Sequence, residues 1–414
     1  TSTITHPSCH WFISFCCNPV TKEITWTIGV NYNKAELEGV VVEDFIERAD
    51  AQDFNIEKVK VYEMILTGDE NGYEIGNEAT YQIAPVTGSD GESGFRVNFG
   101  DISNPYVIQY TTSLQGHLIE GEYRNTATVK TTNAKDSELD ASIKPYDGKE
   151  YTEKNANQNE ANPRIVNWTM KINFNQSTVT NLKIEDTPSI NQSIIKDSFK
   201  LYGTKVTENG VEKDPSKILE KGKDYNVFFE EVGEDGQEKF IFKTYPEDEP
   251  SDKAYVLEYD TYILYTGGEH DNITNEATFH AKEGVSSEAG DKFSRAVNLS
   301  SIGGGITGNV GMLQIKKKSD DPNVTELLKG AEFELYDQDG EVLLRTGTTD
   351  ENGVVTFKNL LQGKYLLKET AAPEYHIIGK NAEQIVEVNS SITELEIENE
   401  KIKQHFELTK IDDK

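Results

Sequence analysis

Leu313-Gln-Ile-Lys-Lys317 alternates apolar and polar side chains, and a lysine takes its last inward position. Successive side chains of a β-strand point to opposite faces, so Lys317 shares the buried face with Leu313 and Ile315. Two later runs of the same form end in Glu369 and in Asn399. The pattern predicts an all-β domain with three polar side chains turned into its core.

These three side chains together indicate a chemical reaction. A lone charge is costly in an apolar core, and burial favours a neutral amine and a protonated acid. The amine of Lys317 can then attack the Asn399 carboxamide while Glu369 polarises the carbonyl and carries protons as ammonia leaves. The product is an amide bond between Lys317 and Asn399. A surface lysine, a solvated glutamate and a turn asparagine are the alternatives, and the conjunction of the three favours the crosslink.

The segment from Gly311 to about Lys403 resembles a B-type repeat of Gram-positive collagen adhesins, the prealbumin-like domain also found in pilins. The matching landmarks follow the opening run in order: Gly330-Ala-Glu-Phe-Glu-Leu-Tyr336, Thr349-Asp-Glu-Asn-Gly353, Gly363-Lys-Tyr-Leu-Leu-Lys-Glu369-Thr-Ala-Ala-Pro373 and Ile397-Glu-Asn399. The resemblance implies an intramolecular isopeptide bond from Lys317 to Asn399, with Glu369 as the catalytic acid. Pro373-Glu-Tyr375 departs from the family by lacking the glycine usual before that tyrosine, which should alter a turn only.

The end of the chain repeats the opening run of this domain. Phe406-Glu-Leu-Thr-Lys410-Ile-Asp412 aligns with Leu313-Gln-Ile-Lys-Lys317-Lys-Ser319 and places Lys410 on Lys317. The middle lysine of the three at 316–318 is therefore the inward one. Lys410 is the expected crosslinking lysine of a further repeat that begins near residue 404, so we expect the natural protein to continue beyond Lys414.

An internal duplication precedes this domain. Ile24-Thr-Trp-Thr-Ile-Gly-Val-Asn31 returns as Val166-Asn-Trp-Thr-Met-Lys-Ile-Asn173, and Val42-Glu-Asp44 returns as Ile184-Glu-Asp186. Both offsets are 142 residues (166 − 24 and 186 − 44). Two copies of one domain with antiparallel, face-packed sheets are predicted.

The two copies are similar to the A-type, collagen-binding-domain-like modules of the same adhesins, which are immunoglobulin-like sandwiches. Such modules often hold a Lys–Asn bond with an aspartate as the catalytic acid. The resemblance implies Lys144, Asp186 and Asn298 in the second copy, with Asn275 as the main alternative acceptor. A hydrogen-bonded asparagine and a solvated aspartate are the other interpretation of these residues.

The first copy departs from that pattern. Asp44 is present, but no lysine precedes Lys22 and the last strand, near Leu139 to Ile143, offers no asparagine. We predict that this copy has no crosslink; a covalent bond from Lys22 or Lys34 would contradict that prediction.

Composition narrows the class of protein. The chain has 41 Lys plus Arg against 72 Asp plus Glu, a formal charge of −31, which argues against nucleic acid and anionic membrane as partners. No apolar run reaches membrane-spanning length. The three cysteines, Cys9, Cys16 and Cys17, lie in the first 17 residues and cannot staple the domains. With His6 and His10 they fit no metal-site spacing, so no metal and no cofactor is expected.

The expected division of the chain has six parts. They are an unassigned leader at 1–18, a first sandwich at 19–140 with an incomplete first strand, a second sandwich at 141–303, a flexible glycine-rich linker at 304–311, the B-type domain at 312–403, and the first strand of a further repeat at 404–414.

These features predict a tension-bearing surface protein. The resemblance implies an extracellular adhesin or its stalk, anchored to peptidoglycan by a sorting signal not seen in this chain, with collagen or another matrix protein as a possible ligand. Self-crosslinking happens once per molecule, so the protein is not an enzyme in the usual sense. A crosslink closing 82 residues (399 − 317) adds roughly 4 kcal/mol by analogy with disulfides. The alternatives are a sortase-polymerised pilin subunit and, with less support, an extracellular hydrolase.

Overall fold

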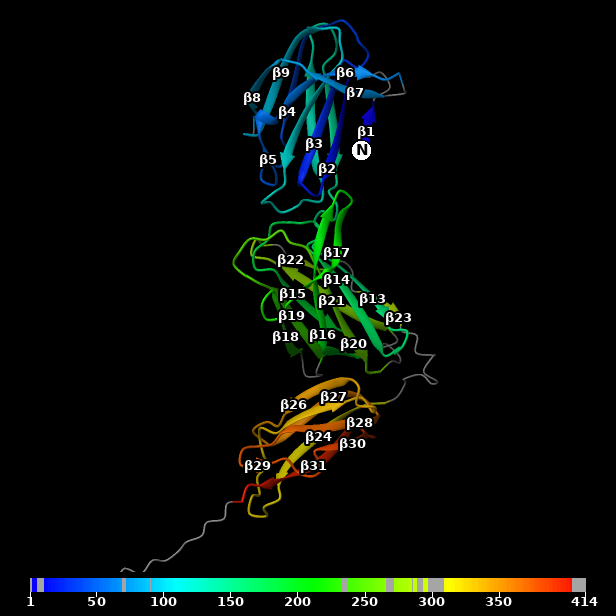
Figure 1. Ribbon diagram of the computed structural model, residues 1–414, viewed down its shortest axis with the longest axis vertical. Helices are drawn as coiled ribbons and strands as arrows, with labels where there is room; N and C mark the ends of the chain where they lie inside the picture. The colour runs from blue at the N-terminus through cyan, green and yellow to red at the C-terminus, as the bar shows by residue number, and fades with distance from the viewer. Residues whose placement is uncertain are drawn as a thin grey trace, which may run out of the picture.

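A computed structural model describes residues 2–5, 11–68, 72–89, 91–232, 237–265, 272–284, 286–288, 293–296 and 309–403. Three β-domains follow one another along the long axis of the molecule (Figure 1). We call them the first sandwich (residues 2–143), the second sandwich (152–296) and the third domain (309–403). The described part contains no helix long and apolar enough to cross a membrane.

The first sandwich packs a seven-stranded sheet against a five-stranded one. Its strands have one face on the core, as the alternating burial of β11 shows. The larger sheet has the order β1 (Ser2–Thr5), β2 (Trp11–Asn18), β3 (Glu23–Val30), β10 (Tyr106–Ser113), β6 (Lys60–Leu66), β7 (Tyr73–Glu78), with β5 (Asp53–Phe54) on β10. The smaller sheet has the order β12 (Ser137–Ile143), β11 (Tyr123–Lys130), β4 (Leu37–Phe45), β9 (Ser93–Ile102), β8 (Gln82–Thr87). A 3₁₀ turn covers Ile56–Lys58.

The second sandwich repeats this plan with five strands facing six. One sheet has the order β13 (Thr152–Gln158), β14 (Ile165–Ile172), β20 (Tyr255–Ile263), β16 (Gln192–Thr207), β17 (Gly210–Leu219). The other has the order β18 (Tyr225–Val232), β19 (Gln237–Thr244), β15 (Lys183–Pro188), β21 (Asn272–His280), β22 (Ser286–Glu288), with β23 (Phe293–Ala296) on β21. Trp26 and Trp168 are each 1% exposed and stand opposite Tyr110 and Tyr259 in the two copies. The predicted duplication is therefore present in three dimensions.

The third domain is a smaller sandwich of two four-stranded sheets. One has the order β27 (Val354–Leu361), β24 (Val310–Ser319), β31 (Ile392–Lys401), β29 (His376–Ile377), and the other β26 (Leu343–Thr348), β25 (Glu332–Tyr336), β28 (Gly363–Ala371), β30 (Glu383–Val388). Its first and last long strands, β24 and β31, pair in parallel. The ends of the domain are thus neighbours within one sheet.

Two expected boundaries are wrong. Residues 11–18 form β2, which pairs with β3 along its whole length, so the supposed leader supplies the first sandwich with a strand. Residues 137–143 form β12, which pairs with β11 and buries Ile143 in the first core. The second sandwich therefore begins at β13 and not at residue 141. β12 is an edge strand with weak apolar alternation, whereas β2 is an apolar strand that lies between β1 and β3 and is placed by its pairing with them.

The first two sandwiches meet at a specific polar junction. Lys22, which is 8% exposed, reaches from the first sandwich and donates to the carbonyl of Gln176 at 2.9 Å and to the Asp252 carboxylate at 2.5 Å. Close by, the Ile119 amide donates to the Ser177 hydroxyl at 2.8 Å. These contacts hold the turn at residues 173–178 against the first sandwich.

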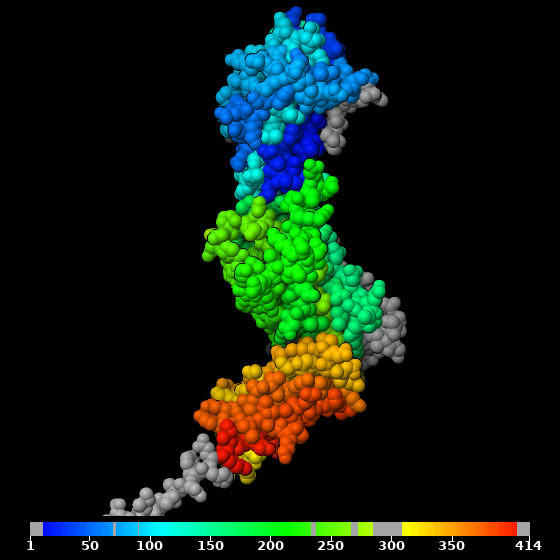
Figure 2. All heavy atoms as spheres, viewed as in Figure 1, coloured from blue at the N-terminus to red at the C-terminus, as the bar shows by residue number. Residues whose placement is uncertain are grey.

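The second sandwich and the third domain also share a buried interface, which differs from the flexible joint that the glycine-rich linker predicts. Arg345 and Glu238 lie 3.1 Å apart and are 5% and 7% exposed. Ser193 donates to the carbonyl of Leu344 at 2.6 Å. Tyr262 belongs to the same apolar cluster as the core of the third domain. Figure 2 shows successive domains in close contact. Residues 304–308 of the linker lie outside the described residues.

Replacing Arg345 with alanine is expected to loosen this interface. Glu238 would lose its buried cation, a change that costs about 3–5 kcal/mol when both partners are desolvated. The Ile194 amide, which donates to Glu238 at 2.7 Å, should exchange its hydrogen faster in the full chain. Lys329→Ala removes an exposed pair with Glu351 and is the matched control. Unchanged exchange at Ile194 in Arg345→Ala would contradict a docked interface.

Candidate functional site

The three polar residues singled out in the third domain meet in its core. Lys317 lies on β24, Asn399 on the neighbouring β31, and Glu369 on β28 of the facing sheet. The Lys317 amine lies 2.7 Å from Asn399 Oδ1 and 2.8 Å from Glu369 Oε2. Asn399 Nδ2 donates to Glu369 Oε1 at 2.6 Å. Each member thus contacts the other two.

Burial sets the electrostatics of this trio. Lys317 and Asn399 are 0% exposed and Glu369 is 6% exposed. Desolvation lowers the pKa of Lys317, although the hydrogen bond and charge of Glu369 oppose that shift. The neutral amine, which is the nucleophilic form, is therefore easier to reach here than in water.

Gly379 supplies a contact that the sequence analysis missed. Its amide donates to Asn399 Oδ1 at 3.2 Å, so the carboxamide oxygen has a second donor besides the lysine. A donor at this oxygen stabilises the negative charge that develops when an amine adds to the carbon. A Cβ at this position would lie 2.7 Å from the Glu398 carbonyl oxygen, which explains the glycine. No local pattern marks this residue, because the approach is made by a loop.

A second buried lysine and acid lie in the second sandwich. Lys154 on β13 contacts Asp186 on β15, and their side chains are 3% and 0% exposed. The Tyr259 hydroxyl donates to both Asp186 oxygens at 3.1 and 3.2 Å. Asn275 Nδ2 donates to the same hydroxyl at 2.8 Å, while Asn275 Oδ1 is buried with no partner. Lysine, acid and carboxamide thus gather around one tyrosine.

Desolvation again governs protonation in this group. Burial lowers the pKa of Lys154 to about 8, against the opposing charge of Asp186. Burial also raises the pKa of Asp186 and raises that of Tyr259 well above its ordinary range. The group therefore favours a neutral amine and a protonated acid more than exposed side chains do.

Of the three crosslinking residues predicted for the second sandwich, the structure places only one as expected. Asp186 lies at the centre, as expected. Lys144 is wrong: it is exposed just after β12 of the first sandwich, and Lys154 is the lysine that meets Asp186. Asn298 lies outside the described residues, whereas the alternative acceptor Asn275 is in contact with the group. Lys410 also lies outside the described residues.

Sequence reasoning missed Lys154 because its strand does not look like one. Thr152-Glu-Lys-Asn-Ala-Asn-Gln158 has only Ala156 as an apolar residue. Pairing with β14 identifies the position: Ala156 stands opposite Trp168 and Lys154 opposite Met170. The available signal was position: Lys154 lies two residues before Ala156, the residue that pairs with Trp168.

The first sandwich has the acid and the amide without the amine. Asp44 Oδ2 accepts from the Tyr110 hydroxyl and from Asn125 Nδ2, both at 2.9 Å. Lys22 is engaged at the domain junction and Lys34 is exposed. The absence of a crosslink in this copy stays a prediction.

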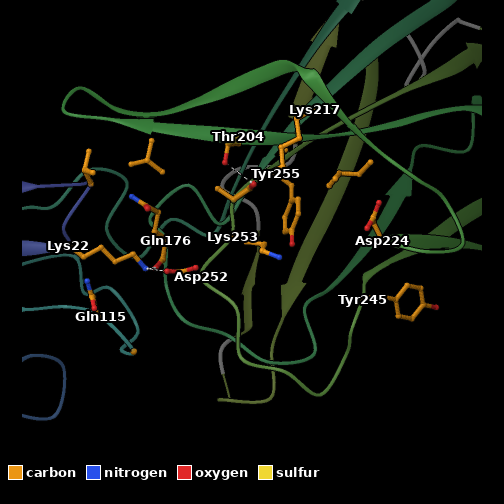
Figure 3. A pocket seen from close by; sticks show the side chains of 16 residues that line it. Lys22, Gln115, Gln176, Thr204, Lys217, Asp224, Tyr245, Asp252, Lys253 and Tyr255 are labelled. Carbon is orange, nitrogen blue, oxygen red and sulfur yellow. Dashed lines mark hydrogen bonds and ion pairs between the residues drawn. The ribbon is translucent and has the colours of Figure 1, made fainter.

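A groove of about 530 Å³ opens where the two sandwiches meet (Figure 3). Lys22 and Asp252 stand at one end, joined by their ion pair. Lys217, Tyr245 and Tyr255 line the side that the second sandwich contributes.

The cysteines and acidic residues show no metal centre in the part of the chain that is described. Cys16 and Cys17 are unpaired thiols on β2, and no group of three or more His, Cys, Asp or Glu is placed to hold an ion there. Cys9 lies outside the described residues.

Comparison with known families agrees with this architecture. Residues 17–140 and 149–289 match the model of the collagen binding domain, and together they make up more than half of the chain. The chain belongs to the collagen binding domain family. Residues 311–401 match a second model, the prealbumin-like fold domain. The two resemblances inferred from sequence motifs are confirmed.

A curated relative of this family member is the collagen adhesin of Staphylococcus aureus, 26% identical over 155 residues. The match takes in 36% of this chain and 13% of the adhesin, so the chain spans a small part of that relative. Among solved structures, the major pilin BcpA of Bacillus cereus is 17% identical and covers 83% of this chain and 100% of its own, with a TM-score of 0.25. Domains D2 and D3 of the major pilin SpaD of Corynebacterium diphtheriae are 18% identical and cover 60% and 98%, with a TM-score of 0.24.

Asp44 makes the stability of the first collagen binding domain depend on pH. Burial raises the pKa of this 0% exposed carboxyl to about 7. The folded state therefore holds the proton more tightly than the unfolded state, whose aspartates titrate near about 3.9. This stabilisation is complete below about pH 4 and is lost as pH rises to about 7, a change of about 4 kcal/mol.

Asp44→Asn should abolish this part of the pH dependence, since the amide stays neutral throughout. The measurement is the unfolding free energy of the first sandwich in the full chain between pH 4 and 8. Asp140→Asn, at an exposed site on β12, is the control and should keep the wild-type slope. A wild-type slope in Asp44→Asn would show that Asp44 is ionised in the folded state.

Proposed function

We propose that this protein is an extracellular adhesin segment of a Gram-positive bacterium, stiffened by autocatalytic Lys–Asn amide bonds. The observation that carries the proposal is the mutual contact of Lys317, Glu369 and Asn399 inside an apolar core. Lys317 is 0% exposed, and an unreacted lysine there would destabilise the core through the desolvation of its charge. Conversion to an amide removes the charge and retains the contact.

The reaction needs only these residues. Glu369 takes a proton from the Lys317 ammonium, and the neutral amine attacks the Asn399 side-chain carbon. The Gly379 amide, which donates to Asn399 Oδ1, stabilises this oxygen as it gains charge. The second proton of the attacking nitrogen passes through Glu369 to the old amide nitrogen, the carbon–nitrogen bond to that nitrogen breaks, and ammonia leaves, while Glu369 keeps the first proton. Each molecule reacts once, so the protein is not an enzyme with turnover.

A second amide bond, between Lys154 and Asn275, is proposed for the second sandwich. Asp186 is in contact with the lysine and shares the Tyr259 hydroxyl with Asn275. Asp186 takes the role of Glu369. The unpartnered Asn275 Oδ1 is the atom on which charge would develop.

The positions of the bonds suit a protein under tension. Lys317 and Asn399 lie on β24 and β31, the first and last long strands of the third domain, which pair in parallel. Force applied through the two ends of the domain would pass along these strands, and a covalent tie between them blocks their separation. The end-to-end arrangement of the three domains suits a stalk or tether (Figure 2).

Adhesion is proposed for the two collagen binding domains. The family match and the collagen adhesin relative support a matrix protein such as collagen as ligand. The groove at their junction is the candidate contact surface. Attachment to peptidoglycan is proposed through a sorting signal.

Intact mass under denaturing conditions tests the crosslinks. The wild-type chain should be lighter than its sequence by two ammonia equivalents, one for each amide bond. Glu369→Ala and Asp186→Ala should each restore one of them, and peptide mapping should locate the branched peptides. Glu398→Ala and Glu185→Ala, which change neighbouring carboxylates, should leave both losses in place. A wild-type mass equal to that of the sequence would refute the crosslinks.

Binding to immobilised collagen, fibrinogen and fibronectin tests adhesion. We expect saturable binding of the full chain to one of them, and weakening by at least about tenfold, which is about 1.4 kcal/mol, in Lys217→Glu/Lys253→Glu. Both lysines are exposed and line the groove. Lys329→Glu reverses an exposed charge in the third domain and is the control. No saturable binding to any of the three would leave only the stalk role.

A further inference from the structure

The two sandwiches differ at one position of their buried polar groups. In the second, Lys154 stands opposite Met170 on the strand that carries Trp168. The equivalent of Met170 in the first is Ile28, at the same offset as the two tryptophans (170 − 28 = 142 and 168 − 26 = 142). Ile13 on β2 stands opposite Ile28 and is 2% exposed. An isoleucine thus fills the place of the lysine.

The other members of the group are retained in the first sandwich. Asp44, Tyr110 and Asn125 are 0%, 1% and 2% exposed, close to the values of Asp186, Tyr259 and Asn275. Asp44 binds the tyrosine and the asparagine with one oxygen only. Its other oxygen, Oδ1, is buried without a hydrogen-bond partner. In the second sandwich the aspartate has a further partner, which is Lys154.

A buried carboxyl with an unused oxygen is costly. The family match also separates β2 from the rest of this domain. The match begins at residue 17, so Ile13 lies before it, whereas β13 of the second sandwich lies inside the matched residues 149–289. Most of the strand in the lysine position of the first sandwich therefore lies outside the matched residues.

We infer that Asp44, Tyr110 and Asn125 form an intact acceptor site for a primary amine delivered by the strand that pairs with β3, at the position of Ile13. This inference rests on the proposed crosslinking function and extends it to the domain that has no lysine in the site. A lysine-bearing strand in the place of β2 is the chemical partner of this site.

The reaction at the site balances without any external reagent. The amine adds to the Asn125 side-chain carbon, the new carbon–nitrogen bond forms, and the bond to the original amide nitrogen breaks. That nitrogen leaves as ammonia with a proton carried by Asp44. Tyr110 holds the carboxyl through its hydroxyl and positions it, as Tyr259 holds Asp186.

The test is the intact mass of the full chain carrying Ile13→Lys. We expect the loss of one ammonia equivalent more than in wild type, with a branched peptide that joins position 13 to Asn125. Ile13→Lys/Asp44→Asn should lack that additional loss, because the proton carrier is removed. Ile13→Met, an unbranched side chain without an amine, should match wild type.

Folding of the variant is checked by the melting transition of the first sandwich. If Ile13→Lys does not fold, a second variant is tested in which residues 152–158 replace residues 11–17. The transplanted strand places its lysine at position 13, because the two strands pair with their neighbours in the same register. A folded chain of either kind with no additional ammonia loss would overturn the inference. The wild-type losses assigned to Asn275 and Asn399 are read in the same spectra. Their absence would refute the proposed function, whereas their presence without a third loss would refute this inference alone.

Discussion

A lysine amine held beside a carboxyl group inside an apolar core is the constraint on which this structure depends. Lys317 and Lys154 are both desolvated, and each has one acid and one carboxamide within its group. As an ion pair such an arrangement returns little of the cost of removing two charges from water. As the precursor of a neutral amide it is consistent with the rest of the core. Facing sheets are required, because the acid comes from the sheet opposite the lysine in both domains.

The two sandwiches share one fold but differ in the residues of their buried polar groups. The second sandwich has lysine, aspartate, tyrosine and asparagine, and the first has the last three with Ile13 in the lysine position. The surrounding strands keep their pairing, as the equivalent registers of Trp26 and Trp168 show. Chemistry in this fold therefore depends on single residues at fixed register positions. Folding of the framework depends on the apolar residues between them.

The joints between domains matter as much as their cores for a protein that bears load. Lys22 at one joint and Arg345 at the other are largely removed from solvent and paired across the interface. Buried ion pairs give specificity of orientation more than stability. A glycine-rich linker in the sequence indicates chain freedom but carries no information on whether the flanking domains dock. Here Tyr262 and the Arg345 pair hold the second sandwich and the third domain together.

The sequence by itself determined the all-β class and the trio Lys317, Glu369 and Asn399, which rest on alternation within strands. It also determined the duplication, which rests on motifs repeated at an offset of 142 residues. The resemblance to the A-type modules also pointed to Asp186. Tertiary structure alone decided on Lys154 in place of Lys144, on β2 as part of the first sandwich, and on Gly379 as a donor to Asn399. The physical reason is that β13, β2 and the loop at Gly379 are positioned by the segments they pair with or approach, and not by a pattern of their own. Their side chains then carry no periodic signal of burial, as the single apolar residue of β13 shows.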